Sequence, residues 1–140
     1  MSAQLILQPV IALLLLTCFM AVWMFVTRIP AMKRMRIHPQ KAQDTHKLRD
    51  MLPPEISRVS NNYNHLFEQP VVFYALAIVI GVLGHTDMTF IYMAWTYVAL
   101  RFAHSIIQAT VDKVMVRFTL FAISWVVLGA MVVREALILF

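Results

Sequence analysis

The stretch Asn61-Asn-Tyr-Asn-His-Leu-Phe-Glu-Gln-Pro70, followed by the apolar run 71–83, decides how this chain folds. It places a carboxylate, Glu68, at the start of a segment that is apolar enough to enter a bilayer. A charged side chain at the centre of a membrane helix costs roughly 3 kcal/mol on insertion scales. The position of Glu68 therefore predicts that a charged partner or a ligand lies close to its carboxylate.

The composition indicates an integral membrane protein. Hydrophobic residues make up 61% of the chain and charged residues only 14%, whereas about a quarter of a soluble domain is charged. The apolar residues form four blocks, each close to the roughly 20 residues that cross a bilayer. These blocks are about 5–27, 62–83, 88–109 and 114–139. We predict one domain, 1–140, that is an all-α bundle of four transmembrane helices, and the N-terminus lacks the pattern of a cleavable signal.

The basic residues predict the orientation of the bundle. Eight of them lie between the first two blocks: Arg28, Lys33, Arg34, Arg36, Lys41, Lys47, Arg49 and Arg58. Because positively charged loops stay in the cytoplasm, we expect the loop 28–61 and the turn 110–113 to be cytoplasmic. Both termini then face the periplasm or a lumen.

Prolines divide the first loop and bend the second helix. Four of them, Pro30, Pro39, Pro53 and Pro54, disfavour one long helix in the loop. Short helices are expected between residues 40 and 51. Pro70 cannot donate a hydrogen bond to the carbonyl of Leu66, which predicts a kink just beyond Glu68. The kink could serve helix packing, or it could expose a backbone carbonyl beside a polar site, and the sequence does not decide between the two.

Polar side chains are predicted to share helix faces in the cytoplasmic half of the bundle. On the second helix they are Asn61, Asn64 or His65, and Glu68; on the third, Arg101, His104, Ser105 and Gln108. Arg117 lies about one turn into the fourth helix. In the outer half of the predicted helices only Arg134 and Glu135 carry charge, and we expect them to snorkel to the interface.

Two readings of this cluster are open. In the first, Glu68 and Arg101 form an internal salt bridge that holds the bundle together. In the second, the surplus charge of Arg101 and Arg117, with Arg28 and Arg58 near the mouth, binds an anionic ligand. Arginine suits a ligand with carboxylates, because its planar fork binds them with two hydrogen bonds.

The sequence does not favour a nucleic-acid site or a metal site. The basic residues lie beside membrane helices, so attraction to anionic lipid headgroups explains the high pI better than nucleic acid does. The five histidines are scattered without the paired spacing of metal ligands, and the single cysteine, Cys18, lies in the first span. The sequence therefore predicts neither nucleic-acid binding nor a metal site.

These residues resemble the MAPEG family, the membrane-associated proteins of eicosanoid and glutathione metabolism. The resemblance rests on four short spans, a basic first loop, and an Asn-x-x-Glu-x-x-Pro-like signature that opens the second helix. The segment Leu66-Phe-Glu-Gln-Pro-Val-Val-Phe-Tyr74 is most similar to the bacterial-type branch. Arg101-Phe-Ala-His104 and Arg117 are similar to the family's other marks.

The resemblance implies a homotrimer, in the bacterial inner membrane, that binds glutathione between subunits on the cytoplasmic side. Glu68 would hold the amino group of glutathione, and Arg117 would be the catalytic residue that stabilises its thiolate. The other residues implied in glutathione binding are Arg101, His104, Asn64, His65, Arg28 and Arg58. The thiolate would attack a hydrophobic electrophile from the bilayer or reduce a lipid peroxide.

The sequence also departs from the family pattern. His65 occupies the place of the family's asparagine, and Asn61 the place of a frequent arginine. Phe118 and Phe121 stand where prostaglandin-synthesising relatives carry serine and tyrosine, which argues against arachidonate chemistry. The alternative function is therefore a non-catalytic module with the same fold, one that binds lipid or serves as an accessory subunit of a larger membrane complex.

Overall fold

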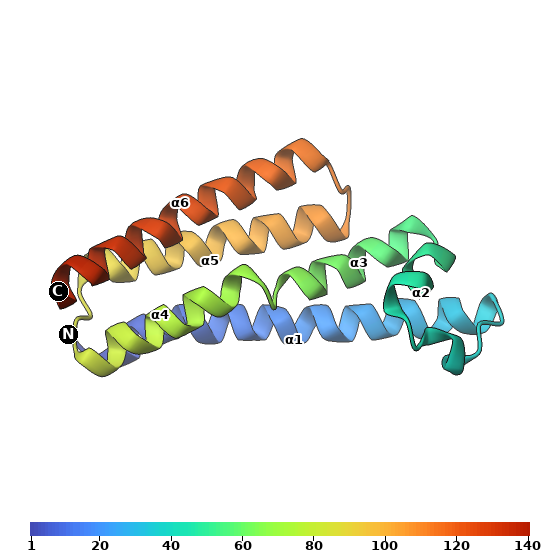
Figure 1. Ribbon diagram of the computed structural model, residues 1–140, viewed down its shortest axis with the longest axis horizontal. Coiled ribbons are helices and arrows are strands. Elements are labelled where there is room, and N and C mark those ends of the chain that lie inside the picture. Colours follow the sequence, from blue (N-terminus) through green and yellow to red (C-terminus); the bar gives the residue numbers. More distant parts are fainter.

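The chain is an all-α membrane protein whose spans form a four-helix bundle (Figure 1). This computed structural model describes residues 1–140, apart from the side chain of Ala42. The helices are α1 (Ala3–Arg34), the 3-10 helix η1 (Pro39–Ala42), α2 (Thr45–Met51), α3 (Pro54–His65), α4 (Gln69–Leu83), α5 (Met88–Ala109) and α6 (Val114–Leu139). Four segments of the described chain are long and apolar enough to cross a membrane, namely α1, α3 with α4, α5, and α6.

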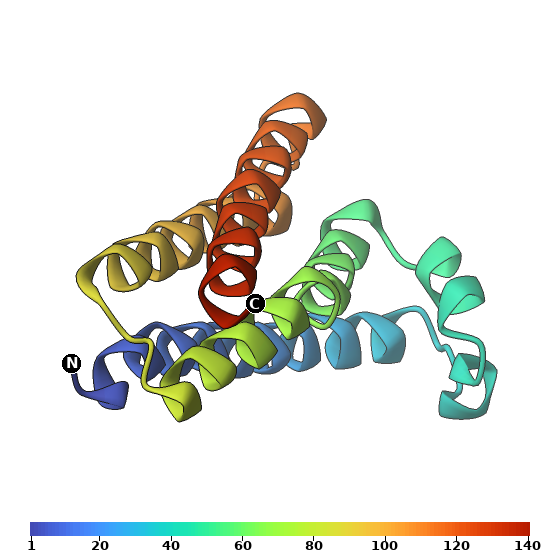
Figure 2. The same ribbon diagram turned by 60° about the vertical axis from the view of Figure 1, so that its left-hand side comes forward.

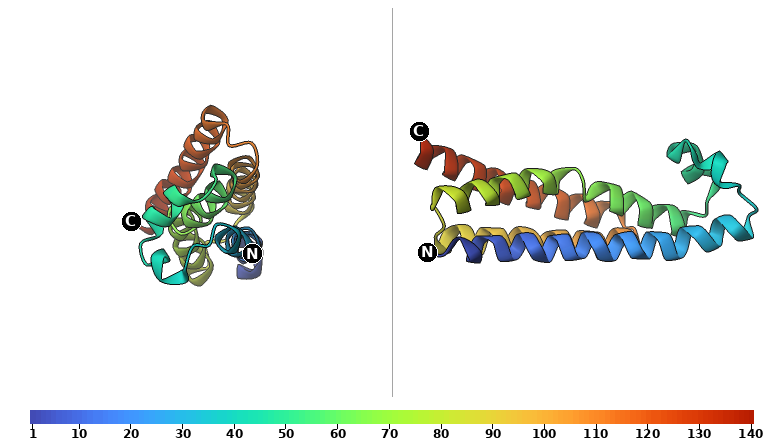
Figure 3. Two further views of the ribbon diagram at one scale, coloured as in Figure 1. Left: turned by 90° about the vertical axis from the view of Figure 1, so that its right-hand side faces the viewer. Right: turned by 90° about the horizontal axis from the view of Figure 1, so that it is seen from below.

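The long helix α1 supports the rest of the bundle. It contacts α3, α4 and α5, and α6 packs mainly against α5. Seen from below, α1 runs the length of the molecule with α3 and α4 beside it (Figure 3). Both termini and the α4–α5 turn lie at one end, called the terminal end. Helices η1 and α2 lie at the other, called the loop end (Figures 1 and 2).

The connection at the loop end is shorter than the predicted loop 28–61. Helix α1 continues to Arg34 although Pro30 lies inside it, and α3 already begins at Pro54. Residues 35–53 connect the two, and they contain the short helices expected between residues 40 and 51. Helix α1 continues beyond Pro30 because the next residue, Ala31, is buried in a small core at the loop end. This packing offsets the backbone hydrogen bond that proline cannot donate.

The second span is broken rather than kinked. Helix α3 ends at His65, and α4 begins at Gln69 with Pro70 in its first turn. Between them the backbone bonds tighten, since the amides of Phe67 and Glu68 donate to carbonyls three residues earlier. Proline suits a first turn, where no intrahelical donor is needed. The break spans residues 66–68 and so ends directly at the position predicted for the kink.

Apolar side chains from all four spans meet in the core of the bundle. Phe73 of α4 is fully buried, and its ring stacks on that of Tyr97 of α5 with 4.6 Å between the centroids. Leu128 of α6 and Leu13 of α1 are fully buried in the same cluster. The side-chain amide of Gln69 lies 3.3 Å from the Tyr97 hydroxyl and 3.1 Å from that of Ser124. The start of α4 is thereby tied to α5 and α6.

A second, smaller core docks the connecting segment on the end of α1. Leu48 of α2 and Leu52 pack with Ala31 and Ile37, and Ile56 of α3 covers them. Helix α2 is further held by the Ser57 hydroxyl, which donates to the backbone carbonyl of Arg49 at 2.8 Å. The segment therefore has a defined position beside α3.

At the terminal end, both Arg134 and Glu135, which were expected to snorkel, have polar partners in the α4–α5 turn. Arg134 donates both guanidinium nitrogens to Asp87, at 3.1 and 2.6 Å, and lies over the ring of Phe90. Glu135 is buried, with its Oε1 2.7 Å from Nδ1 of His85. The expectation of snorkelling is wrong for Glu135, because the α4–α5 turn covers the end of α6 and supplies partners for both residues.

The Asp87–Arg134 pair predicts a stability change at low pH. The Arg134 hydrogen bond holds the pKa of the Asp87 carboxyl below its ordinary 3.8. A carboxyl with a lowered folded-state pKa stabilises the fold above its ordinary value, and this contribution disappears as the pH falls through the lowered value. We expect acidification below about pH 4 to destabilise the wild type more than Asp87→Asn, by under about 1 kcal/mol because the pair is partly exposed.

Thermal unfolding in detergent at pH 6 and pH 3 measures this difference. Asp87→Asn keeps an oxygen that can accept from the amide of Phe90, as Asp87 does at 2.8 Å, so the cap of α5 is preserved. Equal losses in the two proteins would contradict a role for the charge.

Candidate functional site

A polar pocket of about 300 Å³ opens at the loop end, between α2, α3, α5 and α6. Its volume is at the lower end of the range for ligand pockets, roughly 300–1,000 Å³. Eight residues line it: His46, Arg49, Asn61, Asn64, His65, Glu68, Gln108 and Arg117. Two arginines face one carboxylate in this set, so the pocket carries a surplus of positive charge.

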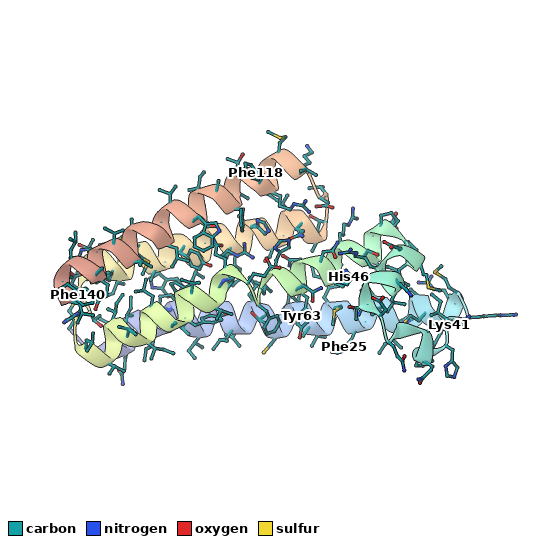
Figure 4. All side chains as sticks on the ribbon, viewed as in Figure 1. Phe25, Lys41, His46, Tyr63, Phe118 and Phe140 are labelled. Carbon is teal, nitrogen blue, oxygen red and sulfur yellow. The ribbon has the colours of Figure 1, made fainter. Side chains whose placement is uncertain are left out.

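A second pocket, mostly apolar and about 210 Å³ in volume, adjoins the first. It is lined by His65, His104, Val114, Arg117, Phe118 and Phe121. His65 and Arg117 belong to both linings. Figure 4 labels His46 of α2, which lines the polar pocket, and Phe118 of α6, which lines the apolar pocket. A polar and an apolar compartment thus meet at an arginine and a histidine.

Glu68 pairs with His65 and not with Arg101. Its Oε2 lies 3.3 Å from Nδ1 of His65, and its side chain is 64% exposed. The break between α3 and α4 explains this, because Glu68 has φ −100° and ψ −100° and leaves the helix face that Arg101 was predicted to meet. The internal salt bridge of the first reading is therefore not formed among the described residues, and the carboxylate faces the polar pocket.

Arg117 is positioned by the turn before α6. Its Nη1 donates to Oδ1 of Asp112 at 2.6 Å, and Asp112 itself has φ +48°. Aspartate is among the few residues that tolerate the left-handed region. The carbonyl of Arg117 lies 3.2 Å from Nδ1 of His104, whose Nε2 is 3.0 Å from Oε1 of Gln108. The two contacts fix the imidazole of His104 where the apolar pocket adjoins the polar pocket.

Three of the predicted site residues lie outside both linings. Arg101 is fully buried within the bundle, and its three guanidinium nitrogens have no hydrogen-bond partner among the described residues. Arg28 of α1 and Arg58 of α3 are half-buried and contribute to neither pocket. The structure brings together Asn64, His65, Glu68, His104 and Arg117, which come from α3, the break after it, α5 and α6.

Two residues that line the polar pocket, and that lie on a helix not considered as part of the site, were missed from the sequence. His46 and Arg49 lie on α2, in the loop for which the sequence predicted short helices and a cytoplasmic location but no part in the site. Arg49 donates from Nη1 to Oδ1 of Asn61 at 3.4 Å, and its Nη2 lies 3.3 Å from Nδ1 of His46. Their spacing of three on a short helix was the only available signal, since nothing local indicates which face of α2 meets α3.

The comparisons with known proteins agree with these features at the level of the family. No curated protein and no solved structure matches the chain. The sequence model of the MAPEG family matches residues 6–137, which is nearly the whole chain, reaches all four spans and includes the lining of both pockets. This membrane bundle, with its paired polar and apolar pockets, belongs to the MAPEG family.

Proposed function

We propose that the protein binds glutathione in the polar pocket and transfers its thiolate to a hydrophobic electrophile in the apolar pocket. One observation supports this above all: Arg117 belongs to both linings. A cation at the junction would lower the pKa of a bound thiol and favour the nucleophilic thiolate. Family membership supports glutathione as the thiol, because the MAPEG family is generally associated with it.

The charges of the polar pocket suit this tripeptide. Glutathione carries one ammonium and two carboxylates, so its net charge is negative and fits a pocket with two arginines and one carboxylate. Glu68, which is exposed to the pocket, would hold the ammonium. His65, paired with Glu68, and the neighbouring Asn64 would offer hydrogen bonds to the peptide groups. Arg101 would act indirectly, as a buried positive charge behind the site.

Two balanced reactions fit the proposed arrangement. In a transfer, the thiolate sulfur forms a bond to an electrophilic carbon, and the leaving group departs with the electron pair of the broken bond. In a peroxidase reaction, two glutathione molecules are oxidised to the disulfide while one lipid hydroperoxide is reduced to an alcohol and water. The lining of Phe118, Phe121 and Val114 favours an apolar second substrate that enters from the bilayer.

We also propose a homotrimer with its loop end in the cytoplasm of a bacterial inner membrane. Large apolar side chains cover the outer face of α1, including Phe19 and Phe25, both more than half exposed. Such a face suits lipid and neighbouring subunits. The eight basic residues at the loop end support the orientation. Labelling of a cysteine introduced at Lys41 from each side of sealed vesicles tests it.

Calorimetric titration with glutathione tests the proposed ligand. We expect the full-length protein in detergent to bind with a dissociation constant below about 1 mM, which corresponds to −4.1 kcal/mol. Glu68→Gln should weaken binding roughly tenfold, because a charge-assisted contact is lost. Glu55→Gln on α3 is the matched control, since Glu55 is exposed and outside the pocket lining. No binding at several millimolar glutathione, with the trimer intact by sedimentation, would refute the proposal.

The second candidate is a non-catalytic module that binds lipid or acts as an accessory subunit. It is favoured by the contact at 2.6 Å between Arg117 and Asp112, which partly neutralises the one cation at the junction. Stoichiometric co-purification with another membrane protein, together with no thiol transfer to hydrophobic electrophiles, would favour this candidate.

A further inference from the structure

The short helix α2 adds a cation to the wall of the polar pocket. Arg49 lines this pocket together with Arg117, although 68 positions separate them in the chain. The two arginines differ in their surroundings. Arg117 is paired with Asp112, whereas no ion pair among the described side chains involves Arg49. Arg49 is therefore the uncompensated positive charge of the pocket.

Neutral contacts hold Arg49 in place without neutralising it. The side-chain oxygen of Asn61 accepts from Nη1 at 3.4 Å, and Nδ1 of His46 lies 3.3 Å from Nη2. The backbone carbonyl of Arg49 accepts from the Ser57 hydroxyl at 2.8 Å, and Leu48, next along the chain, is buried in the small core. A guanidinium that is fixed on two sides and still lacks a carboxylate is suited to bind one from a ligand.

Arg49 also lies away from the chemistry of the proposed reaction. It lines only the polar pocket, while Arg117 lines both pockets. If the thiolate lies at Arg117, Arg49 meets a part of glutathione that is remote from the sulfur. Glutathione has two carboxylates. The one at the γ-glutamyl end is attached to the same α-carbon as the ammonium group that Glu68 would attract. The glycine carboxylate has no such neighbour and needs a cation of its own.

We infer that Arg49 binds the glycine carboxylate of glutathione and that Asn61 positions the guanidinium for it. The inference rests on the proposed function, because it concerns the same ligand and the same pocket. It makes α2, a part of the connecting segment, a specificity element of the site. A ligand that lacks a free carboxylate at this end is expected to bind weakly.

Glutathione and its glycine ethyl ester test the inference by calorimetric titration of the full-length protein in detergent. We expect the wild type to bind the ester roughly tenfold more weakly than glutathione, because a charge-assisted contact is lost. Arg49→Gln should bind glutathione roughly tenfold more weakly than the wild type and should no longer distinguish glutathione from the ester. Asn61→Ala, which frees the guanidinium, should show a partial loss of this discrimination.

Lys47→Gln is the matched control, because it removes the same charge from the same helix at an exposed position outside the pocket lining. It should leave both affinities unchanged. If the wild type binds glutathione and Arg49→Gln binds it equally well, the inference is overturned while the proposed function stands. Equal affinity of the wild type for glutathione and its ester has the same consequence. A wild type that binds no glutathione overturns the proposed function and this inference with it.

Discussion

Arg117→Ala is expected to lower kcat for thiol transfer roughly 100-fold while the affinity for glutathione falls much less. The expectation follows from the place of Arg117 at the junction of the two pockets. A cation there would stabilise the negative charge on sulfur, and removal of one such stabilising group typically costs a factor of about 10²–10³ in kcat. Stopped-flow absorbance with an aromatic electrophile measures turnover, and calorimetry measures binding.

Two further variants separate the chemical role of Arg117 from its structural role. Asp112→Asn leaves the arginine in place but removes the carboxylate 2.6 Å from Nη1, so the thiolate should be favoured more strongly and kcat should not fall. Lys113→Ala removes a nearby cation that lies outside both linings and should change neither quantity. An Arg117→Ala protein that keeps full turnover would contradict the proposed role.

Phe73→Ala is expected to have the largest effect on stability, a loss of about 3 kcal/mol in the free energy of unfolding. Phe73 is fully buried and stacked on Tyr97, so truncation leaves a cavity between α4 and α5. In soluble cores this substitution costs about 3–5 kcal/mol. We expect a cost at the low end of this range in the membrane bundle. An apolar side chain is also favourably surrounded when it faces lipid, so the lost free energy comes mainly from lost packing contacts.

Phe25→Ala is the matched control for this measurement. Phe25 is 55% exposed on α1 and labelled at the edge of the bundle in Figure 4. Its truncation should change stability by less than about 0.5 kcal/mol, as surface substitutions usually do. Unfolding in mixed micelles of increasing denaturing detergent compares the two. Equal losses would show that the Phe73–Tyr97 contact does not hold the helices together.

Most of the bundle was predictable, because membrane spans are encoded locally. Helices α5 and α6 have the predicted bounds, since a bilayer sets their length and short polar turns stop them. Asp87 caps α5, and Gly84 ends α4 with φ +73°, a conformation that glycine adopts at little cost. These signals act within a few residues, so the sequence alone carries them.

The position of the connecting segment was not predictable in the same way. Nothing near Arg34 in the sequence says that α1 continues past Pro30 until the small core of Ala31, Leu48 and Leu52 is assembled. The same packing places His46 and Arg49 on the polar pocket. Asn61, the hydrogen-bond partner of Arg49, lies 12 residues after it, and helical periodicity gives no information about contacts between separate elements.

The sequence by itself determined the membrane bundle and placed His65, Glu68 and Arg117 at its polar end, because apolar length and helical spacing are local properties. The tertiary structure alone decided what those residues face. The break before Pro70 turns Glu68 away from Arg101 and toward His65, and the docking of α2 brings a second arginine to the pocket. The docking of α2 depends on contacts between distant parts of the chain, and the start of α4 is held by the contacts of Gln69 with Tyr97 and Ser124. Such contacts form only when the helices pack.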